Sequence, residues 1–382
     1  MILELRLTTK KPMNIVRKII KNGVYWSFLR VIRRLKKPHN RSIKLFMDSI
    51  YSIKNKIIQL SASQVNENKN FVAVYDLSSN SISYDFAFFL AAAESYSIKK
   101  GCTSFFVNII RVENDAFKGS AYSEIFDEES LKWKLDNIII PLISLYPKCS
   151  GYKISPRYEN IQLLPQEKII YPQFYSANYS PTLDYKEIFL ILKENKFTGF
   201  RASKQGIRYI NLWLKKKNIT KRVVTITLRN YNFDTSRNSN IDEWVKFANW
   251  LIEEGFSPVF LPDTESSFIP DERLSSFFEF VESSWNLGLR MALYENSYLN
   301  FVSAGPASIA QLNRKVRYIS MINVIEGSPL ASRKIFKKMG MKIDVNFDFA
   351  KWYQVLSWKE DSFDNITQEF QGFLALEKIN KS

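Results

Sequence analysis

The stretch that decides the fold extends from Arg222 to Arg229 and reads Arg-Val-Val-Thr-Ile-Thr-Leu-Arg. Its β-branched residues between two charged ends are typical of a buried strand. A polar loop over 230–240 follows, then an apolar face at helical spacing over 242–254 and a second apolar run over 256–262. A strand, a helix and a strand in this order predict a βαβ unit, and therefore a parallel sheet.

The same half of the chain contains two more apolar runs, over 298–303 and 316–321. Between them lies the turn Ala-Gly-Pro-Ala-Ser over 304–308, which leads into a short helix ending near Leu312. Glycine allows close approach of the backbone, and proline suits a first helical turn. Backbone N–H groups at such a helix start can bind an anion. An ordinary tight turn between strand and helix is the alternative.

Two arginines are expected near that turn. Arg229 ends the first strand and Arg237 lies in the loop after it, and parallel strands share one carboxyl edge. Two guanidinium groups beside a helix start are suited to binding a diphosphate. Arginines at solvated strand ends are the alternative explanation.

The first half of the body shows a second βαβ pattern. An apolar run over 70–76 precedes a helical stretch over 84–99, and a further apolar run occupies 103–110. Two acids, Asp76 and Asp85, lie at the carboxyl end of the strand and at the start of the helical stretch. A carboxylate in this position can act as a general base, although capping the next turn or helix is its commoner role.

A helix is predicted over 128–147, followed by loops and a linker over 150–200, where Tyr, Pro and Ser are frequent and periodicity is weak. We therefore expect an α/β protein with three parts. Residues 1–60 form a basic helical extension, residues 61–195 form an N-terminal α/β domain with a linker, and residues 196–382 form a C-terminal α/β domain.

The positive charge is concentrated at the start of the chain. Residues 1–60 hold 15 Lys and Arg against two acids, whereas the other 322 residues hold 39 basic and 36 acidic groups. Apolar residues at helical spacing run through the basic segment, so residues 13–60 are predicted to lie on an anionic membrane surface. A helix packed on the body is the alternative. Nucleic acid is not an expected partner, because no reading module or base-stacking platform is recognisable.

Several classes of protein are excluded by composition. One His and two Cys in 382 residues leave no Ser-His-Asp triad in the main body, no disulfide framework and no Cys-rich zinc site. No Gly-x-Gly-x-x-Gly or Walker A motif follows a predicted strand. No apolar run reaches membrane-spanning length and no secretory signal is visible, so a cytoplasmic protein is expected.

Residues 222–321 resemble the donor-binding half of GT-B glycosyltransferases, in particular uncharacterised ones found with bacterial surface-polysaccharide genes. The resemblance rests on the following short motifs: Thr227 to Arg229, Arg237 to Ser239, Trp244, Asp263 to Glu265, Arg290 to Glu295 and Asn300 to Pro306, with Tyr75 to Leu77, Tyr84 to Phe86, Ala93-Glu94 and Trp133 to Pro141 upstream.

The resemblance implies two Rossmann-like domains facing a cleft, with the nucleotide-sugar donor in the C-terminal domain and a glycan or lipid-linked acceptor in the N-terminal one. The final helix would pack back across both domains. Asp76 or Asp85 would act as the base on an acceptor hydroxyl, with no metal and no cofactor. The implied donor-binding residues are Arg229, Arg237, Asn238, Asp263, Glu295, Ser303, Gly305, Pro306, Ala307 and Ser308. Such an enzyme would work on the inner face of the plasma membrane.

Two rival functions remain open at this point. A GT-A transferase would use Asp263-Thr264-Glu265 to bind a metal, but one acidic triplet after a strand is common. A non-catalytic scaffold at the membrane surface would keep the fold and lose the chemistry. Nucleotide binding without turnover would favour this scaffold.

Overall fold

The computed structural model describes residues 71–111, 126–156, 169–173, 175, 180–194, 196–232, 234–303, 305–328 and 330–381. The chain divides into two units, and the fold below belongs to the unit formed by 66–172 and 182–382. The predicted basic extension, residues 1–60, and its membrane-binding part, residues 13–60, lie outside the described residues.

The C-terminal half is built on a six-stranded sheet in which every pairing is parallel. Its order is β10-β9-β8-β5-β6-β7, the order of a doubly wound sheet in which the chain reverses direction between β5 and β8. Ligands of such sheets bind outside the carboxyl ends of the strands at this reversal. The strands are β5 (Arg222–Thr227), β6 (Phe256–Leu261), β7 (Phe278–Glu279), β8 (Leu299–Val302), β9 (Tyr318–Met321) and β10 (Gln354–Ser357).

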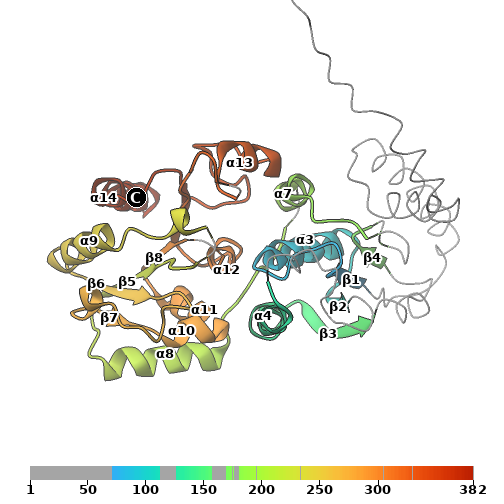
Figure 1. The fold of residues 1–382 in the computed structure, drawn as a ribbon, viewed down its shortest axis with the longest axis horizontal. Coiled ribbons are helices and arrows are strands. Elements are labelled where there is room, and N and C mark those ends of the chain that lie inside the picture. Colours follow the sequence, from blue (N-terminus) through green and yellow to red (C-terminus); the bar gives the residue numbers. More distant parts are fainter. Residues whose placement is uncertain are drawn as a thin grey trace, which may run out of the picture. The chain divides into compact units, whose positions relative to one another are not determined.

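Helices flank this sheet in Figure 1. They are α8 (Lys204–Lys216), α9 (Ile241–Glu253), α10 (Glu282–Trp285), α11 (Leu287–Asn296), α12 (Ala307–Gln311), α13 (Arg333–Met339) and α14 (Phe363–Lys381), with short 3₁₀ turns η2 (Thr235–Arg237) and η3 (Glu272–Leu274). The strands and helices predicted from Arg222 to Met321 are thereby confirmed.

The last helix packs differently from what the resemblance implied. The buried side chains of α14 (Ile366, Phe370 and Phe373) share a core with Trp244 and Phe247 of α9, within the C-terminal half. Figure 1 shows α14 beside α9 on the side of the sheet away from β1 to β4. The prediction that this helix crosses both domains was therefore wrong, because its apolar face packs against α9 and the C-terminal sheet.

The N-terminal half contains a parallel sheet of order β3-β2-β1-β4. Its strands are β1 (Phe71–Asp76), β2 (Phe105–Arg111), β3 (Cys149–Pro156) and β4 (Ile169–Tyr171). Its helices are α3 (Asp85–Lys99), α4 (Glu128–Lys134), the π-helix η1 (Leu135–Ile139), α5 (Ile140–Ser144) and α7 (Tyr185–Glu194). The predicted βαβ unit of β1, α3 and β2 is confirmed, and so is the fold class of two Rossmann-like α/β halves.

The interpretation of residues 150–200 as loops and linker was wrong in three places. This segment contains most of β3, all of β4 and the helix α7. Only Ser155 of β3 is buried, because the strand lies at the sheet edge, so its sequence has no apolar run. The three residues of β4 are too few for a periodic pattern. The predicted residue boundaries of the domains remain predictions.

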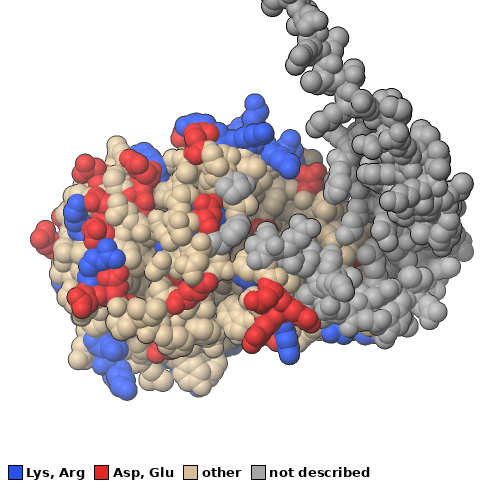
Figure 2. All heavy atoms as spheres, viewed as in Figure 1, with Lys and Arg blue, Asp and Glu red and all other residues tan. Residues whose placement is uncertain are grey.

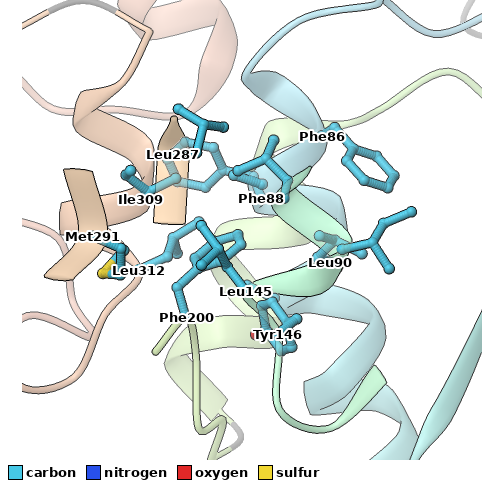
Figure 3. Packing of buried hydrophobic residues seen from close by; sticks show 14 of the residues in the cluster. Phe86, Phe88, Leu90, Leu145, Tyr146, Phe200, Leu287, Met291, Ile309 and Leu312 are labelled. Atoms are coloured by element: carbon cyan, nitrogen blue, oxygen red, sulfur yellow. The ribbon is translucent and has the colours of Figure 1, made fainter. Parts of the chain in front are cut away.

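The two halves share one hydrophobic core. Phe88 of α3, Tyr146 and Phe200 come from one side, and Met291 of α11 and Ile309 of α12 from the other (Figure 3). This common core places the carboxyl ends of β1 and β5 next to the same interface.

A buried carboxylate ties the connection between the halves to α3. Oε2 of Glu94 accepts hydrogen bonds from the Tyr146 hydroxyl at 2.7 Å and from the backbone N–H groups of Thr198 and Gly199 at 2.9 and 3.1 Å. These bonds hold the connecting segment 196–202 against the N-terminal half.

The charge of the described part is mixed. Figure 2 shows basic and acidic side chains interspersed on the visible face, as expected for a body whose 39 basic and 36 acidic groups nearly cancel. Among the described residues, no helix combines the length and the apolar character needed to span a membrane.

Candidate functional site

Two cavities open where the halves meet, at the carboxyl edge of β5 and β8. The larger cavity, of about 570 Å³, is lined by Tyr84, Phe126, Trp133 and Lys134 from the N-terminal half and by Arg229, Arg237, Asp263, Trp285, Arg290, Gly305 and Pro306 from the C-terminal half, among others. The smaller cavity, of about 190 Å³, is lined by Asp85, Ser303, Ala307 and again Arg229 and Arg237. The two arginines therefore line both cavities.

Arg229 is held in place by the loop that follows β5. Its Nη1 donates to the carbonyl oxygen of Asp234 at 3.0 Å and to Oδ1 of Asn238, and that same Oδ1 accepts from the N–H of Tyr231 at 3.1 Å. The residue is only 5% exposed. Burial and the neighbouring Arg237 charge lower the pKa of Arg229, so its charge costs free energy that an anion would recover. Asn238 thus orients the arginine.

Arg237 ends the 3₁₀ turn η2 and is half-buried in the walls of both cavities. The turn starts at Asp234, which has a left-handed φ of 57°. Oδ2 of Asp234 accepts a hydrogen bond from Ser328 at 2.8 Å. This loop, and not the strand alone, directs Arg237 toward Arg229.

Arg290 of α11 is a third cation in the larger cavity, and it is 2% exposed. Its Nε donates to the Ser283 carbonyl at 2.9 Å and its Nη1 donates to the Tyr294 hydroxyl at 3.2 Å. Tyr84 of the N-terminal half lies nearby, and burial raises its pKa to about 12, so its phenol stays protonated and can donate a hydrogen bond.

The turn at Gly305 fits closely under Tyr84. A Cβ on Gly305 would lie 2.5 Å from Cδ2 of the Tyr84 ring, so any larger residue would displace it. The Ser303 hydroxyl donates to the Thr227 carbonyl at 2.9 Å, and the Ser308 hydroxyl donates to the Gly305 carbonyl at 3.0 Å. The helix after the turn, α12, has five residues, which gives it a small dipole. The arginines therefore supply most of the positive potential.

Of the two acids predicted for catalysis, one faces a cavity. Asp85 lines the smaller cavity with both arginines, and its Oδ2 accepts from the Ser81 hydroxyl at 3.0 Å. Asp76 is 1% exposed, and its Oδ1 accepts from the N–H of Ser78 at 2.8 Å. Asp76 is not among the described residues that line either cavity, and its bond to Ser78 instead stabilises the loop between β1 and α3.

Of Asp263 and Glu295, the two acids predicted to bind ribose or sugar hydroxyls, only Asp263 lines the larger cavity. Asp263 follows β6, lines the larger cavity and accepts from the N–H groups of Asn230 and Thr264 at 3.2 and 2.8 Å. Glu295 lies at the connecting segment, where its Oε1 accepts from the N–H of Ala202 at 3.1 Å and from Nδ2 of Asn313 at 2.6 Å. Glu295 therefore fastens the connection between the halves to the C-terminal half.

The structure adds residues that sequence reasoning did not assign to the site. Trp133 of α4 and Trp285 of α10 meet edge to face across the larger cavity, with ring centroids 5.9 Å apart. Tyr84, Lys134 and Arg290 are also in its walls. Arg290, Trp133 and Tyr84 occur in motifs already noted for the resemblance, and this was the one signal that pointed to them.

Among the residues that the structure describes, no three His, Cys, Asp or Glu side chains gather closely enough to hold a metal ion. In the wall of the larger cavity, Asp263 and Glu265 lie two positions apart in sequence, and both interact with the charge of Lys134, while Asp263 also interacts with that of Arg229. Nearby cations compete with a metal for these carboxylates.

No protein-family model and no curated protein matches this sequence. Among solved structures, the chain is similar to a family 9 glycosyltransferase from Veillonella parvula (9% identity, 80% of this chain and 97% of that one, TM-score 0.47) and to the E. coli ADP-heptose LPS heptosyltransferase II (9%, 81% and 99%, TM-score 0.45). A fucosyltransferase from Bradyrhizobium matches more weakly (8%, 65% and 94%, TM-score 0.27).

Proposed function

We propose that the protein is a glycosyltransferase that moves a sugar from a nucleoside diphosphate donor to a hydroxyl group of a glycan or lipid-linked acceptor. The observation that carries this proposal is the pair Arg229 and Arg237 at the reversal point of a doubly wound sheet, between two cavities. Ligands of such sheets bind at that point, and guanidinium groups match the geometry of phosphate oxygens.

In this proposal the diphosphate lies against Arg229 and Arg237, and Arg290 adds a third positive charge. The bond between the anomeric carbon and the phosphate oxygen breaks, and its electron pair goes to the diphosphate. Fixed cations stabilise that developing charge because they need no reorganisation when it forms. Asp263, in the same cavity, is placed to accept hydrogen bonds from ribose or sugar hydroxyls.

Asp85 is the proposed general base. The acceptor oxygen attacks the anomeric carbon and its proton passes to the Asp85 carboxylate. The hydrogen bond from Ser81 at 3.0 Å orients that carboxylate, and the second cavity beside it leaves space for an acceptor. The arginines would replace a divalent cation as counter-charge, so we expect chelators to leave donor binding unchanged.

The function is tested by incubating the protein with UDP-, GDP-, ADP- and dTDP-linked sugars and measuring release of the nucleoside diphosphate, with EDTA or Mg²⁺ present. Water serves as a slow acceptor, so the natural acceptor need not be known. We expect release from one donor class, equal in both buffers. Binding of a nucleotide with no release from any donor would favour the non-catalytic scaffold.

We also propose that residues 13–60 hold the protein on an anionic membrane surface, on the support of the 15 basic and two acidic groups among residues 1–60. Replacing Arg33, Arg34, Lys36 and Lys37 by Gln removes four charges, each worth about 1 kcal/mol near such a surface. Binding to phosphatidylglycerol vesicles should weaken about 100-fold or more, with nucleotide binding unchanged. Equal binding of both proteins to these vesicles would rule the proposal out.

A further inference from the structure

Lys134 is the cation that the N-terminal half contributes to the larger cavity. It is the last residue of α4, and its side chain reaches the C-terminal half. Its Nζ lies 4.5 Å from the centroid of the Phe126 ring, 5.5 Å from that of the Tyr231 ring and 3.5 Å from the Tyr231 hydroxyl. The ammonium group is therefore held among aromatic rings at the interface of the halves.

The charge of Lys134 is only partly compensated. The nearest acids that act on it are Glu265 and Asp263, yet among the described residues it forms no salt bridge. Burial lowers the pKa of Lys134, and the two acids offset this in part. A half-buried ammonium group without an ion pair costs free energy, which an anionic ligand would recover.

Lys134 and Arg229 both contact the ring of Tyr231. The guanidinium carbon of Arg229 lies 5.8 Å from the centroid of the same Tyr231 ring that Lys134 contacts. Lys134 and Arg229 belong to different halves, so Tyr231 links two cations that approach the cavity from opposite parts of the fold.

The backbone next to Lys134 is unusual. The π-helix η1 begins at the next residue, and Nδ2 of Asn137 donates to the Trp133 carbonyl at 2.9 Å inside it. Wide turns of this kind occur often at functional sites, where they redirect side chains. Here Trp133 and Lys134, immediately before the wide turn, both line the larger cavity.

We propose that Lys134 binds the donor diphosphate from the N-terminal half, opposite Arg229 and Arg237, so that both halves hold the ligand. The inference rests on the proposed function and names a binding residue that it does not require. A diphosphate offers one phosphate to the arginines and a second to Lys134. A monophosphate bound to the arginines has no second phosphate for Lys134 to contact.

The test uses Lys134→Met, which keeps an unbranched apolar stem among the aromatic rings and removes the charge. The matched control is Lys132→Met, an exposed lysine of the same helix that is not among the cavity-lining residues. Calorimetric titrations use UDP, GDP, ADP and dTDP, each with its monophosphate. In Lys134→Met, we expect the Kd of the preferred diphosphate to rise about tenfold or more and that of its monophosphate less than about threefold. Lys134→Arg should restore most of the diphosphate affinity.

The melting temperature of the unliganded protein separates binding from folding. Because burial disfavours the ammonium group, Lys134→Met should melt at the same temperature as the unchanged protein or higher. A lower Tm together with equal loss of mono- and diphosphate affinity would mean a structural role and would overturn the inference. So would an equal effect of Lys132→Met.

Two results separate the role of Lys134 from nucleotide binding by the protein as a whole. If the unchanged protein binds a diphosphate and Arg237→Ala weakens it, but Lys134→Met leaves the Kd unaltered, only the inference about Lys134 is wrong. If the unchanged protein binds none of the eight nucleotides, both are wrong.

Discussion

Replacing Asp85 by Asn is expected to lower the rate of nucleoside diphosphate release by roughly 10²–10⁴-fold, the usual contribution of a general base. The amide keeps an oxygen that can accept the hydrogen bond from Ser81, so the loop should keep its conformation. The Kd for the nucleoside diphosphate should stay within about threefold, because Asp85 contacts the acceptor side in the proposed mechanism. Steady-state release assays and titrations measure the two quantities.

Two further variants make this result specific. Asp136→Asn makes the same chemical change at an exposed residue of the N-terminal half that is not among those lining either cavity, so release should not change. Asp76→Asn makes the same change at the buried acid that ends β1, nine residues before Asp85. Should Asp76→Asn and not Asp85→Asn abolish release at an unchanged nucleotide Kd, the base is Asp76.

Replacing Gly199 by Ala is expected to destabilise the protein by about 3–5 kcal/mol. Gly199 has a left-handed φ of +72°, and a Cβ there would lie 1.9 Å from the carbonyl oxygen of Leu312. Gly199 also pairs with Asn313 through a β-bridge and donates its N–H to Glu94. The methyl group would therefore separate the connecting segment from the C-terminal half. Urea denaturation measures the loss in free energy of unfolding.

Gly255→Ala is the matched control for this effect. Gly255 has a similar φ of +81° at the end of α9, but nothing lies within 4 Å of a Cβ placed there. It should cost about 1–2 kcal/mol, the strain of the left-handed conformation alone. Equal losses in free energy of unfolding for Gly199→Ala and Gly255→Ala would contradict the packing of the connecting segment. They would show that the backbone at Leu312 moves away from the added methyl group without a loss of stability.

The parts of the site that sequence predicted are those whose position follows from the topology of a parallel sheet. Arg229 and Ser303 follow adjacent strands of the C-terminal sheet, β5 and β8, so their meeting at one edge was predictable from the two apolar runs. Asp85 begins the helix that follows β1, so its place at the carboxyl side of that sheet was predictable in the same way. In each case a strand end fixes the location of the side chain to within a few residues.

The parts that were missed depend on packing between the two halves. Lys134 lies on a helix, and nothing in its own neighbourhood of sequence says that it reaches Tyr231, 97 residues away. Arg290 lies in a helix whose apolar residues face the shared core. Glu295 was assigned to ligand binding, but it contacts Ala202 and Asn313, because the chain connection passes over that end of α11.

The edge strand and the short strand of the N-terminal sheet were missed for a different reason. Sequence patterns detect apolar residues that the fold buries, and β3 buries few while β4 has only three residues. Both strands are specified by pairing with β2 and β1, which is a tertiary property.

In the proposed function, the carboxyl edge of the C-terminal sheet, where Arg229 and Arg237 lie, binds a nucleoside diphosphate. The most direct test is calorimetric titration of UDP, GDP, ADP and dTDP into the unchanged protein, Arg237→Ala and Arg222→Ala. Arg237 lines both cavities, whereas Arg222 is an exposed arginine at the other end of β5, over the rings of Phe256 and Tyr298. We expect that one diphosphate binds, that Arg237→Ala raises its Kd by about 10–100-fold, and that Arg222→Ala changes it less than about twofold. No binding by any of the four, or equal effects of the two substitutions, would contradict this proposal.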